Sequence, residues 1–304
     1  MRTALHVLLF LLLPPLLQGV INRVKAAFAG RRGPSVLQLY FDLWKLLRKG
    51  AVYSTTTTWA FRLGPAASLA ALLLAALLLP LGGGLPAPVS FAGDVILFAY
   101  LLGAARFATV LAALDTGSSF EGMGASREVT FSALAEPALF LSIAALAIAR
   151  GSLSWTAMLS GQMQVWHLFG PALAMLVGAL FLVALAENSR IPFDDPNTHL
   201  ELTMVHEVMI LDHSGPDLAF ILYGASLKLF LLGAIVMRLA LPLEASIPAH
   251  VALFVAGMLV FAVVVGIVES TFARLRMNRV PQILIAAGVF AALAVAVILI
   301  RVGA

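Results

Sequence analysis

Residues 173–207 read LAMLVGALFLVALAENSRIPFDDPNTHLELTMVHE, in which an apolar run passes directly into a crowded polar segment. The apolar run is a continuous block of Leu, Ala and Val without the period-two alternation of a barrel strand, so it predicts a membrane-spanning helix. Comparable runs recur along the chain, and about 20 helical residues cross the ~30 Å of hydrocarbon in a bilayer. Only helices and closed barrels satisfy every backbone polar group in lipid. We therefore predict an all-α, polytopic integral membrane protein.

The composition of the whole chain supports this class. Of its 304 residues, 62% are hydrophobic and only 11% are charged, and the mean hydropathy is +1.02. No polar interval is long enough to bury a core of its own, so residues 1–304 are expected to form a single membrane domain. The apolar runs predict eight spans, at residues 3–22, 64–81, 92–114, 131–149, 167–186, 217–241, 250–270 and 281–301.

Basic residues divide unevenly between the two sides that eight spans define. The loops after the first, third, fifth and seventh spans carry most of the Lys and Arg residues, which by the positive-inside rule makes that side cytoplasmic. Both termini are then expected on the non-cytoplasmic side. Because the bases flank membrane spans, the high pI near 9.8 indicates topology, and nucleic-acid binding is not expected. Acidic residues gather on the same side, which favours a polar cavity or a docking surface among the cytoplasmic interfacial loops.

The polar segment at 187–207 crowds ionisable side chains where a helix leaves the bilayer. Charges near hydrocarbon are costly, so they usually line a water-filled or proton-conducting cavity or contact a partner. Pro192 and Pro196 stiffen this segment. The crowding favours a functional role over the alternative, a solvated loop. The ionisable residues are Glu187, Arg190, Asp194, Asp195, His199, Glu201, His206 and Glu207.

Two further segments on the same side carry polar motifs. Residues 30–50, GRRGPSVLQLYFDLWKLLRKG, begin with a basic turn and continue with apolar residues at three- and four-residue spacing. This spacing predicts an amphipathic helix that can lie in the membrane interface, although an ordinary lipid-facing helix is an equal alternative. Residues 114–131, LDTGSSFEGMGASREVTF, are interpreted as a Gly- and Ser-rich polar loop that ends in the pair Arg127–Glu128 as the fourth span begins.

The residues that commonly hold metals are sparse. The chain has no cysteine, which excludes disulfides and thiolate-ligated iron–sulfur or zinc sites within it. His206 and Glu207 resemble the start of a zinc-protease helix, but position 210 is Ile, so the second histidine of that motif is missing. No metal site and no catalytic residue are expected in this chain.

Along nearly its whole length the chain resembles the subunit-one family of respiratory complex I, the membrane subunit that joins the redox arm to the proton-pumping arm. The resemblance lies in GRRGP at 30–34 and in AENSRIPFDD at 186–195. Within the family it is most similar to the branch found in group 4 membrane-bound [NiFe]-hydrogenases, such as formate hydrogenlyase and hydrogenase-4. The matching segments of that branch are DTGSSFEGMGASRE at 115–128, AEPALF at 135–140 and DDPNTHLELTMVHEVMILDHSGP at 194–216.

The chain departs from the quinone-reducing members in the segment that follows PFD. Those members continue with several glutamates, whereas the corresponding positions here are Asn197, His199 and Glu201. In complex I this loop shapes the quinone cavity and the first part of the proton path. The loss of the acids puts quinone use in doubt but leaves a coupling role in place.

The resemblance implies a subunit of a prokaryotic cytoplasmic (inner) membrane complex that contacts the [NiFe] large subunit, the small subunit and antiporter-like membrane subunits. The [NiFe] centre and the iron–sulfur clusters are expected in those partner subunits, and no cofactor in this chain. Two sets of residues are expected to serve these roles. The docking surface for the redox arm would comprise Arg31, Arg32, Asp42, Arg127, Glu128, Arg190, Asp194 and Asp195. The proton relay would comprise Glu136, Glu187, Glu201, Glu207, Lys228 and Glu269.

Lys228 is the sharpest single case for the relay, because it lies inside the apolar run GASLKLFLLGAIVM. Snorkelling, or a static ion pair with a glutamate of a neighbouring span, is the alternative at each relay position. Three other functions remain open for the chain: a quinone-site subunit of an NADH dehydrogenase, a stand-alone ion transporter, and a structural anchor without ion transfer.

Overall fold

The computed structural model describes residues 2–81, 86–194, 204–241 and 247–303. In this part of the chain, eight helices are long and apolar enough to cross a membrane, which confirms the predicted class and the number of spans. They are α1 (Arg2–Phe28), α3 (Trp59–Leu78), α4 (Asp94–Asp115), α5 (Ser119–Arg150), α7 (Gln162–Glu187), α9 (Gly215–Ala240), α10 (Ile247–Thr271) and α11 (Val280–Val302). Short helices α2 (Gln38–Leu47), α6 (Trp155–Met158), α8 (His206–Met209) and η1 (Met277–Arg279) connect them.

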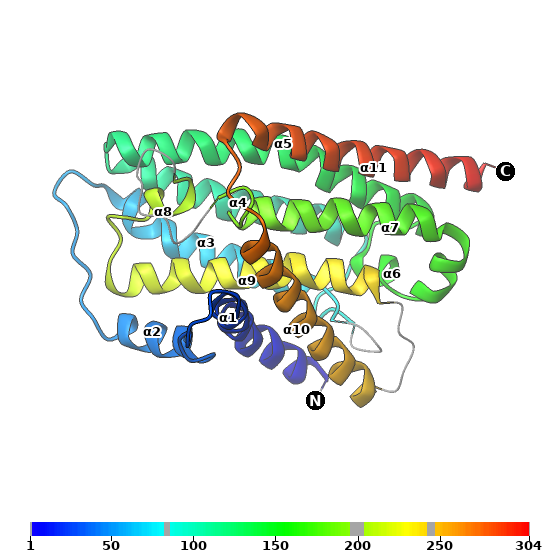
Figure 1. Cartoon of the computed structure of the whole chain (residues 1–304), viewed down its shortest axis with the longest axis horizontal. Helices are drawn as coiled ribbons and strands as arrows, with labels where there is room; N and C mark the ends of the chain where they lie inside the picture. The colour runs from blue at the N-terminus through cyan, green and yellow to red at the C-terminus, as the bar shows by residue number, and fades with distance from the viewer. Residues whose placement is uncertain (1, 82–85, 195–203, 242–246, 304) are drawn as a thin grey trace.

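The long helices pack into one bundle with α9 at its centre (Figure 1). Helix α9 contacts α1, α3, α7 and α10, and it is the most buried of the eight. Helix α11 packs against α5 and α7, so the C-terminal span lies beside two spans from the middle of the sequence. Figure 1 shows α2 and α8 at one end and α6 and the C-terminus at the opposite end. The prediction that the first of these ends is cytoplasmic stays a prediction.

The interpretation of residues 114–131 as a polar loop is wrong. Helix α5 begins at Ser119, twelve residues before the predicted start of the fourth span, and its first turns include Gly122 and Gly124. Glycine disfavours helices by about 1 kcal/mol, but tertiary packing overrides that preference here. A Cβ on Gly124 would lie 2.3 Å from Cγ1 of Val208 and 2.9 Å from the carbonyl oxygen of Val205. The role of Gly124 is therefore to let α8 lie close to α5, and it does not form a turn.

The amphipathic helix predicted near residues 36–47 is present as α2, at Gln38–Leu47. It packs against α9 and α1 while Phe41 and Trp44 remain exposed on its outer side. The preceding turn comes very close to the first span, because a Cβ on Gly19 would lie 1.8 Å from the carbonyl oxygen of Val36. An apolar outer side beside Lys45 and Arg48 is typical of a helix in the membrane interface.

Helix α7 ends deep inside the bundle instead of at its surface. Its last residue, Glu187, meets Lys228 at the middle of α9, thirteen residues and so about 20 Å along the helix from Gly215. The segment that follows, residues 189–194, is buried throughout. For these residues the alternative of a solvated loop is excluded.

Candidate functional site

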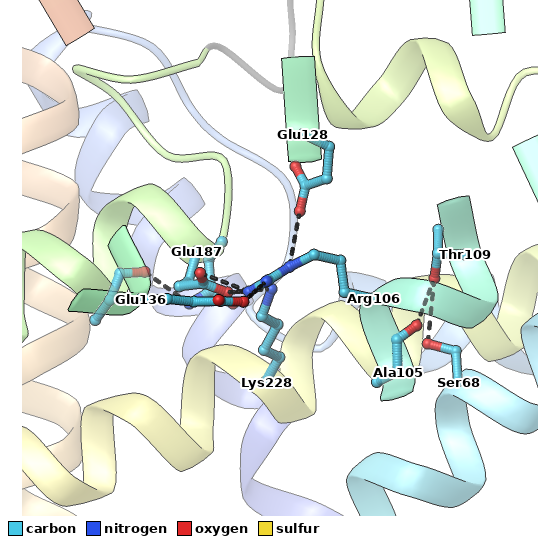
Figure 2. Close-up of polar contacts among 10 residues, drawn as sticks. Ser68, Ala105, Arg106, Thr109, Glu128, Glu136, Glu187 and Lys228 are labelled. Atoms are coloured by element: carbon cyan, nitrogen blue, oxygen red, sulfur yellow. Dashed lines mark hydrogen bonds and ion pairs between the residues drawn. The ribbon is translucent and has the colours of Figure 1, made fainter. Parts of the chain in front are cut away.

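Five ionisable side chains from four helices meet at this depth, and we call them the Arg106 cluster: Arg106 of α4, Glu128 and Glu136 of α5, Glu187 of α7 and Lys228 of α9. Figure 2 shows the Arg106 guanidinium reaching Glu136 and Glu187, with Lys228 approaching from below in this view. Nη2 of Arg106 lies 2.5 Å from Oε2 of Glu187, and Nη1 lies 2.5 Å from Oε1 of Glu136. Nζ of Lys228 lies 2.9 Å from Oε2 of Glu187. Glu187 is thus held by two cations at once.

The three carboxylates of the cluster differ in exposure and in pairing. The Glu187 side chain is 3% exposed, whereas that of Glu136 is 41% exposed. Glu128 lies 3.9 Å from Nε of Arg106, at the limit of an ion pair. With all groups ionised, two cations face three carboxylates, so the cluster carries one unbalanced negative charge. Such charge at membrane depth is costly unless water or another positive group compensates for it.

A small cavity adjoins the cluster. Its volume is about 60 Å³, and it is lined by Arg106, Glu128, Glu187 and Lys228 together with Ser68, Thr109 and His206. A cavity needs roughly 10–15 Å³ per water on this measure, so it has room for about four waters. A second, smaller cavity of about 10 Å³ shares Glu128 and Glu187 and reaches Asp194. Polar groups and water-sized spaces therefore connect the cluster to the buried residues 189–194, which we call the return segment.

A second group of charges, which we call the Glu269 cluster, lies where α1, α10 and the end of α7 meet. Its residues are Lys25, Arg190 and Glu269. Nζ of Lys25 lies 2.8 Å from Oε2 of Glu269, and Nη1 of Arg190 lies 3.2 Å from Oε1 of the same, fully buried carboxylate. Arg190 also donates to Oε1 of Gln18. Because Arg190 lies only three residues after Glu187, the return segment links the two clusters.

The return segment and α8 are fixed by charged side chains. Oδ1 of Asp194 pairs with Nη2 of Arg274 at 2.8 Å, and Oδ2 accepts the backbone N–H of Val205 at 3.0 Å. Nη1 of Arg127 donates to the carbonyl oxygen of Met204 at 2.9 Å. These bonds hold residues 204–206 against α5 from both sides, and they place the half-buried His206 ring at the rim of the larger cavity.

Burial sets the protonation of the two histidines near α8. It lowers the pKa of His206 below the ordinary value of 6.5, an effect that the Glu207 charge opposes and the Lys228 charge reinforces. Burial also lowers the pKa of His213, whose ring stacks on Phe61 with centroids 4.0 Å apart. Both imidazoles are therefore neutral at pH 7.

The residues expected to form the docking surface do not lie together on one surface. Arg31 and Arg32 are exposed, and Asp42 is half-buried and accepts from Nε2 of Gln38 at 2.9 Å. The other described members of the set, Arg127, Glu128, Arg190 and Asp194, are half-buried or buried and bonded within the chain. Asp195 lies outside the described residues. A contact with a partner stays a prediction for all of them, and among the described members it fits the exposed arginines best.

The residues expected to form the relay divide between the two clusters. Glu136, Glu187 and Lys228 belong to the Arg106 cluster, and Glu269 belongs to the other. Glu207 lies on α8 beside His206, and Glu201 lies outside the described residues. A role in proton transfer stays a prediction for each.

Sequence reasoning missed the residue at the centre of the site. Arg106 lies inside the apolar run at 92–114 just as Lys228 lies inside its own run, so the same signal was available. His206 was expected only as one of the crowded ionisable residues of 187–207 and was placed in neither the relay nor the docking surface. Among the described residues, no group of three or more His, Asp or Glu side chains is placed to hold a metal ion.

An all-helical bundle with paired charges around a water-sized cavity at membrane depth defines the class: a polytopic membrane protein with an ionisable interior. The family model described as NADH dehydrogenase, which covers complex I subunit 1, matches residues 1–301. The chain belongs to this family.

Its relatives include membrane subunits of hydrogenase complexes. Hydrogenase-4 component C of Escherichia coli (strain K12) is 34% identical over 276 residues, covering 88% of this chain and 85% of the relative. Formate hydrogenlyase subunit 4 of the same organism is 32% identical, with 92% of each chain covered. NADH-ubiquinone oxidoreductase chain 1 of Triticum aestivum is 27% identical, covering 88% of this chain and 87% of the relative.

A solved structure shares the fold. A chain of the membrane-bound sulfane sulfur reductase, an archaeal respiratory membrane complex, superposes with a TM-score of 0.84 at 21% identity, covering 98% of both chains. The relatives are membrane subunits of multi-subunit respiratory complexes, and this chain, with its eight apolar helices, is a multi-pass membrane protein.

Proposed function

We propose that this chain is the membrane subunit that carries the redox arm of a hydrogenase-type respiratory complex and couples its electron transfer to proton translocation. The observation that carries the proposal is the Arg106 cluster, in which three carboxylates share two cations beside a water-sized cavity at membrane depth. Two relatives above 30% identity, named hydrogenase-4 component C and formate hydrogenlyase subunit 4, support the choice of arm.

The first part of the function is attachment. The exposed turn at Arg31 and Arg32 leads into α2, at the same end of the bundle as α8 (Figure 1). This end would face the cytoplasm of a prokaryote and receive the [NiFe] large subunit and the small subunit with its iron–sulfur clusters, beside antiporter-like membrane subunits. Charge pairs at such a surface fix orientation and raise the association rate more than they add affinity.

The second part is proton transfer through the Arg106 cluster. Glu187 is held by both cations, whereas Glu128 and Glu136 each form an ion pair with Arg106 alone among the described residues. Glu128 and Glu136 are thus the exchangeable carboxylates, since a proton on either one removes the unbalanced charge without freeing a cation. A charge change in the redox arm would alter the local field and shift that proton.

The quinone-site alternative has less support from this cavity. Ligand pockets usually measure about 300–1,000 Å³, a size that a separate, mainly apolar pocket of about 460 Å³ bordered by Glu136 does reach, but the cavity lined by Arg106, Glu187 and Lys228 measures only about 60 Å³. It therefore suits water better than a quinone ring.

Two substitutions test the relay. Glu187→Gln keeps the shape and removes the negative charge that both cations hold, and Lys228→Met removes a positive charge at similar length. In the purified complex in proteoliposomes, we expect the number of protons translocated per electron to fall about tenfold or more with either change. Lys45→Met, an exposed lysine on α2, is the matched control and should leave the ratio unchanged.

Two outcomes would contradict this reading. If both variants assemble and translocate normally, the cluster is a static ion pair and the chain is an anchor without ion transfer. If both fail to assemble with their partners while Lys45→Met assembles, the cluster maintains the fold of the subunit.

A further inference from the structure

His206 occupies a position between the surface and the cavity. It is the first residue of α8, it is half-buried, and it lines the cavity of about 60 Å³ together with Lys228, Glu187 and Glu128. The other charged residues that line this cavity come from long spans and lie at membrane depth. His206 alone among the described lining residues combines an imidazole with partial exposure.

The ring is held in this place by the backbone on which it sits. The backbone N–H groups of Val205 and His206 donate to Oδ2 of Asp194, at 3.0 and 3.4 Å. Asp194 is itself fixed by Arg274, and Gly124 allows α8 to lie directly on α5. A residue anchored in this way keeps a defined distance to the cavity, as a proton-transfer group must.

The charged groups near His206 include one more carboxylate than they have cations in the Arg106 cluster, so the cluster can accept one proton. Within the Arg106 cluster, two cations face three carboxylates, so a single proton brought into the cavity balances the cluster. Further charges act on the ring from its own helix and from the return segment. The groups that face it are Glu207, Asp194, Arg190, Lys228, Arg106, Glu128 and Glu187.

We propose that His206 is the residue through which protons pass between the α8 end of the bundle and the Arg106 cluster. This inference rests on the proposed function and names the entry point of its relay. One ring nitrogen takes a proton from water or from a group of the docked arm, and the N–H bond on the other nitrogen breaks. The released proton moves through cavity water to the carboxylate of Glu128. The imidazole ends neutral, with its tautomer exchanged, and no electron moves in this step.

Two properties of the ring suit this task. The neutral form is present at pH 7, because burial lowers the pKa of His206, so one nitrogen is free to accept. The ordinary pKa of histidine lies close enough to neutrality for both forms to occur when a nearby charge changes. A glutamine at this position keeps hydrogen-bonding atoms but cannot carry the proton.

The test uses the whole complex in proteoliposomes, with protons translocated per electron as the readout. His206→Gln should lower the ratio about tenfold or more and remove a titration from its pH profile. The matched control is His213→Gln, which alters a buried histidine that stacks on Phe61 and does not line the cavity. It should leave both the ratio and the profile unchanged. In His206→Ala, added imidazole should restore transfer, and methylimidazoles of different pKa should restore it to different extents.

Each outcome decides between distinct conclusions. Normal transfer in His206→Gln with loss in Glu187→Gln would overturn the role of His206 and leave the proposed function standing. Normal transfer in both would overturn the proposed function as well. Loss in His206→Gln without rescue of His206→Ala by any imidazole, or failure of both variants to assemble, would make His206 a packing residue and overturn the proposal.

Discussion

Replacing Arg106 with glutamine should destabilise the subunit more than the loss of any surface arginine. Its guanidinium forms short ion pairs with Glu136 and Glu187, and only 11% of its side chain is exposed. Removing one partner of a buried ion pair typically costs about 3–5 kcal/mol. Because Lys228 remains 2.9 Å from Glu187 and glutamine retains a donor, we expect the lower end, about 3 kcal/mol.

The assay is the free energy of unfolding of the purified subunit in detergent micelles. Arg62→Gln is the matched control, because Arg62 is exposed and lies 4.9 Å from the Tyr53 ring, a contact worth about 0.5–1 kcal/mol. The double variant Arg106→Gln/Glu187→Gln should recover part of the lost free energy of unfolding. In this variant the carboxylate that would have lost its arginine partner is absent as well. A cost for Arg106→Gln no larger than that of the control, with no recovery in the double variant, would refute the cluster as the charge centre of the bundle.

The remaining predictions concern α8, the docking turn and topology. Gly124→Ala should destabilise the subunit by about 1–3 kcal/mol, because its Cβ meets Val208, whereas Gly122→Ala, with nothing within 4 Å, should not. A thermal-unfolding comparison that shows equal stability would contradict the close packing of α8 on α5. Charge reversal of Arg31 and Arg32 to glutamate should detach the redox arm, as measured by co-purification, while the chain still inserts; undiminished co-purification would remove this turn from the docking surface. A reporter fused after Lys49 should be cytoplasmic and one at the C-terminus should not, and a cytoplasmic C-terminus would reverse the assigned topology.

The class and the spans could be predicted because the signal is local. Long apolar runs identify membrane helices whatever their neighbours, and all eight predicted spans fall on described helices. The start of α5 could not be predicted in this way. Gly122 and Gly124 favour a loop when read alone, and only the contact between Gly124 and Val208 explains why they are helical.

Three of the five residues of the Arg106 cluster were expected in the relay, but their arrangement and their central arginine were not. Glu136, Glu187 and Lys228 were identified because charges in apolar surroundings are conspicuous in the sequence. Their partner Arg106 is 30 residues from Glu136 and 81 residues from Glu187, and no sequence period links such positions. The burial of the segment after Glu187 was equally hidden, because its composition is that of a surface loop.

Arg106 of α4 pairs with glutamates that all come later in the chain, so it enters the membrane before its ion pairs are complete. An arginine near the middle of a membrane helix costs about 2.5–3.5 kcal/mol on insertion scales. When α4 enters the membrane, Glu187 has not yet been made, and the nearest acidic partners of Arg106 belong to the next helix, α5. Glu187 and Lys228 follow only after α7 and α9 have been added. The first half of the nascent protein must therefore wait in the membrane with its arginine paired to α5 alone, and the cavity takes its final form late in synthesis.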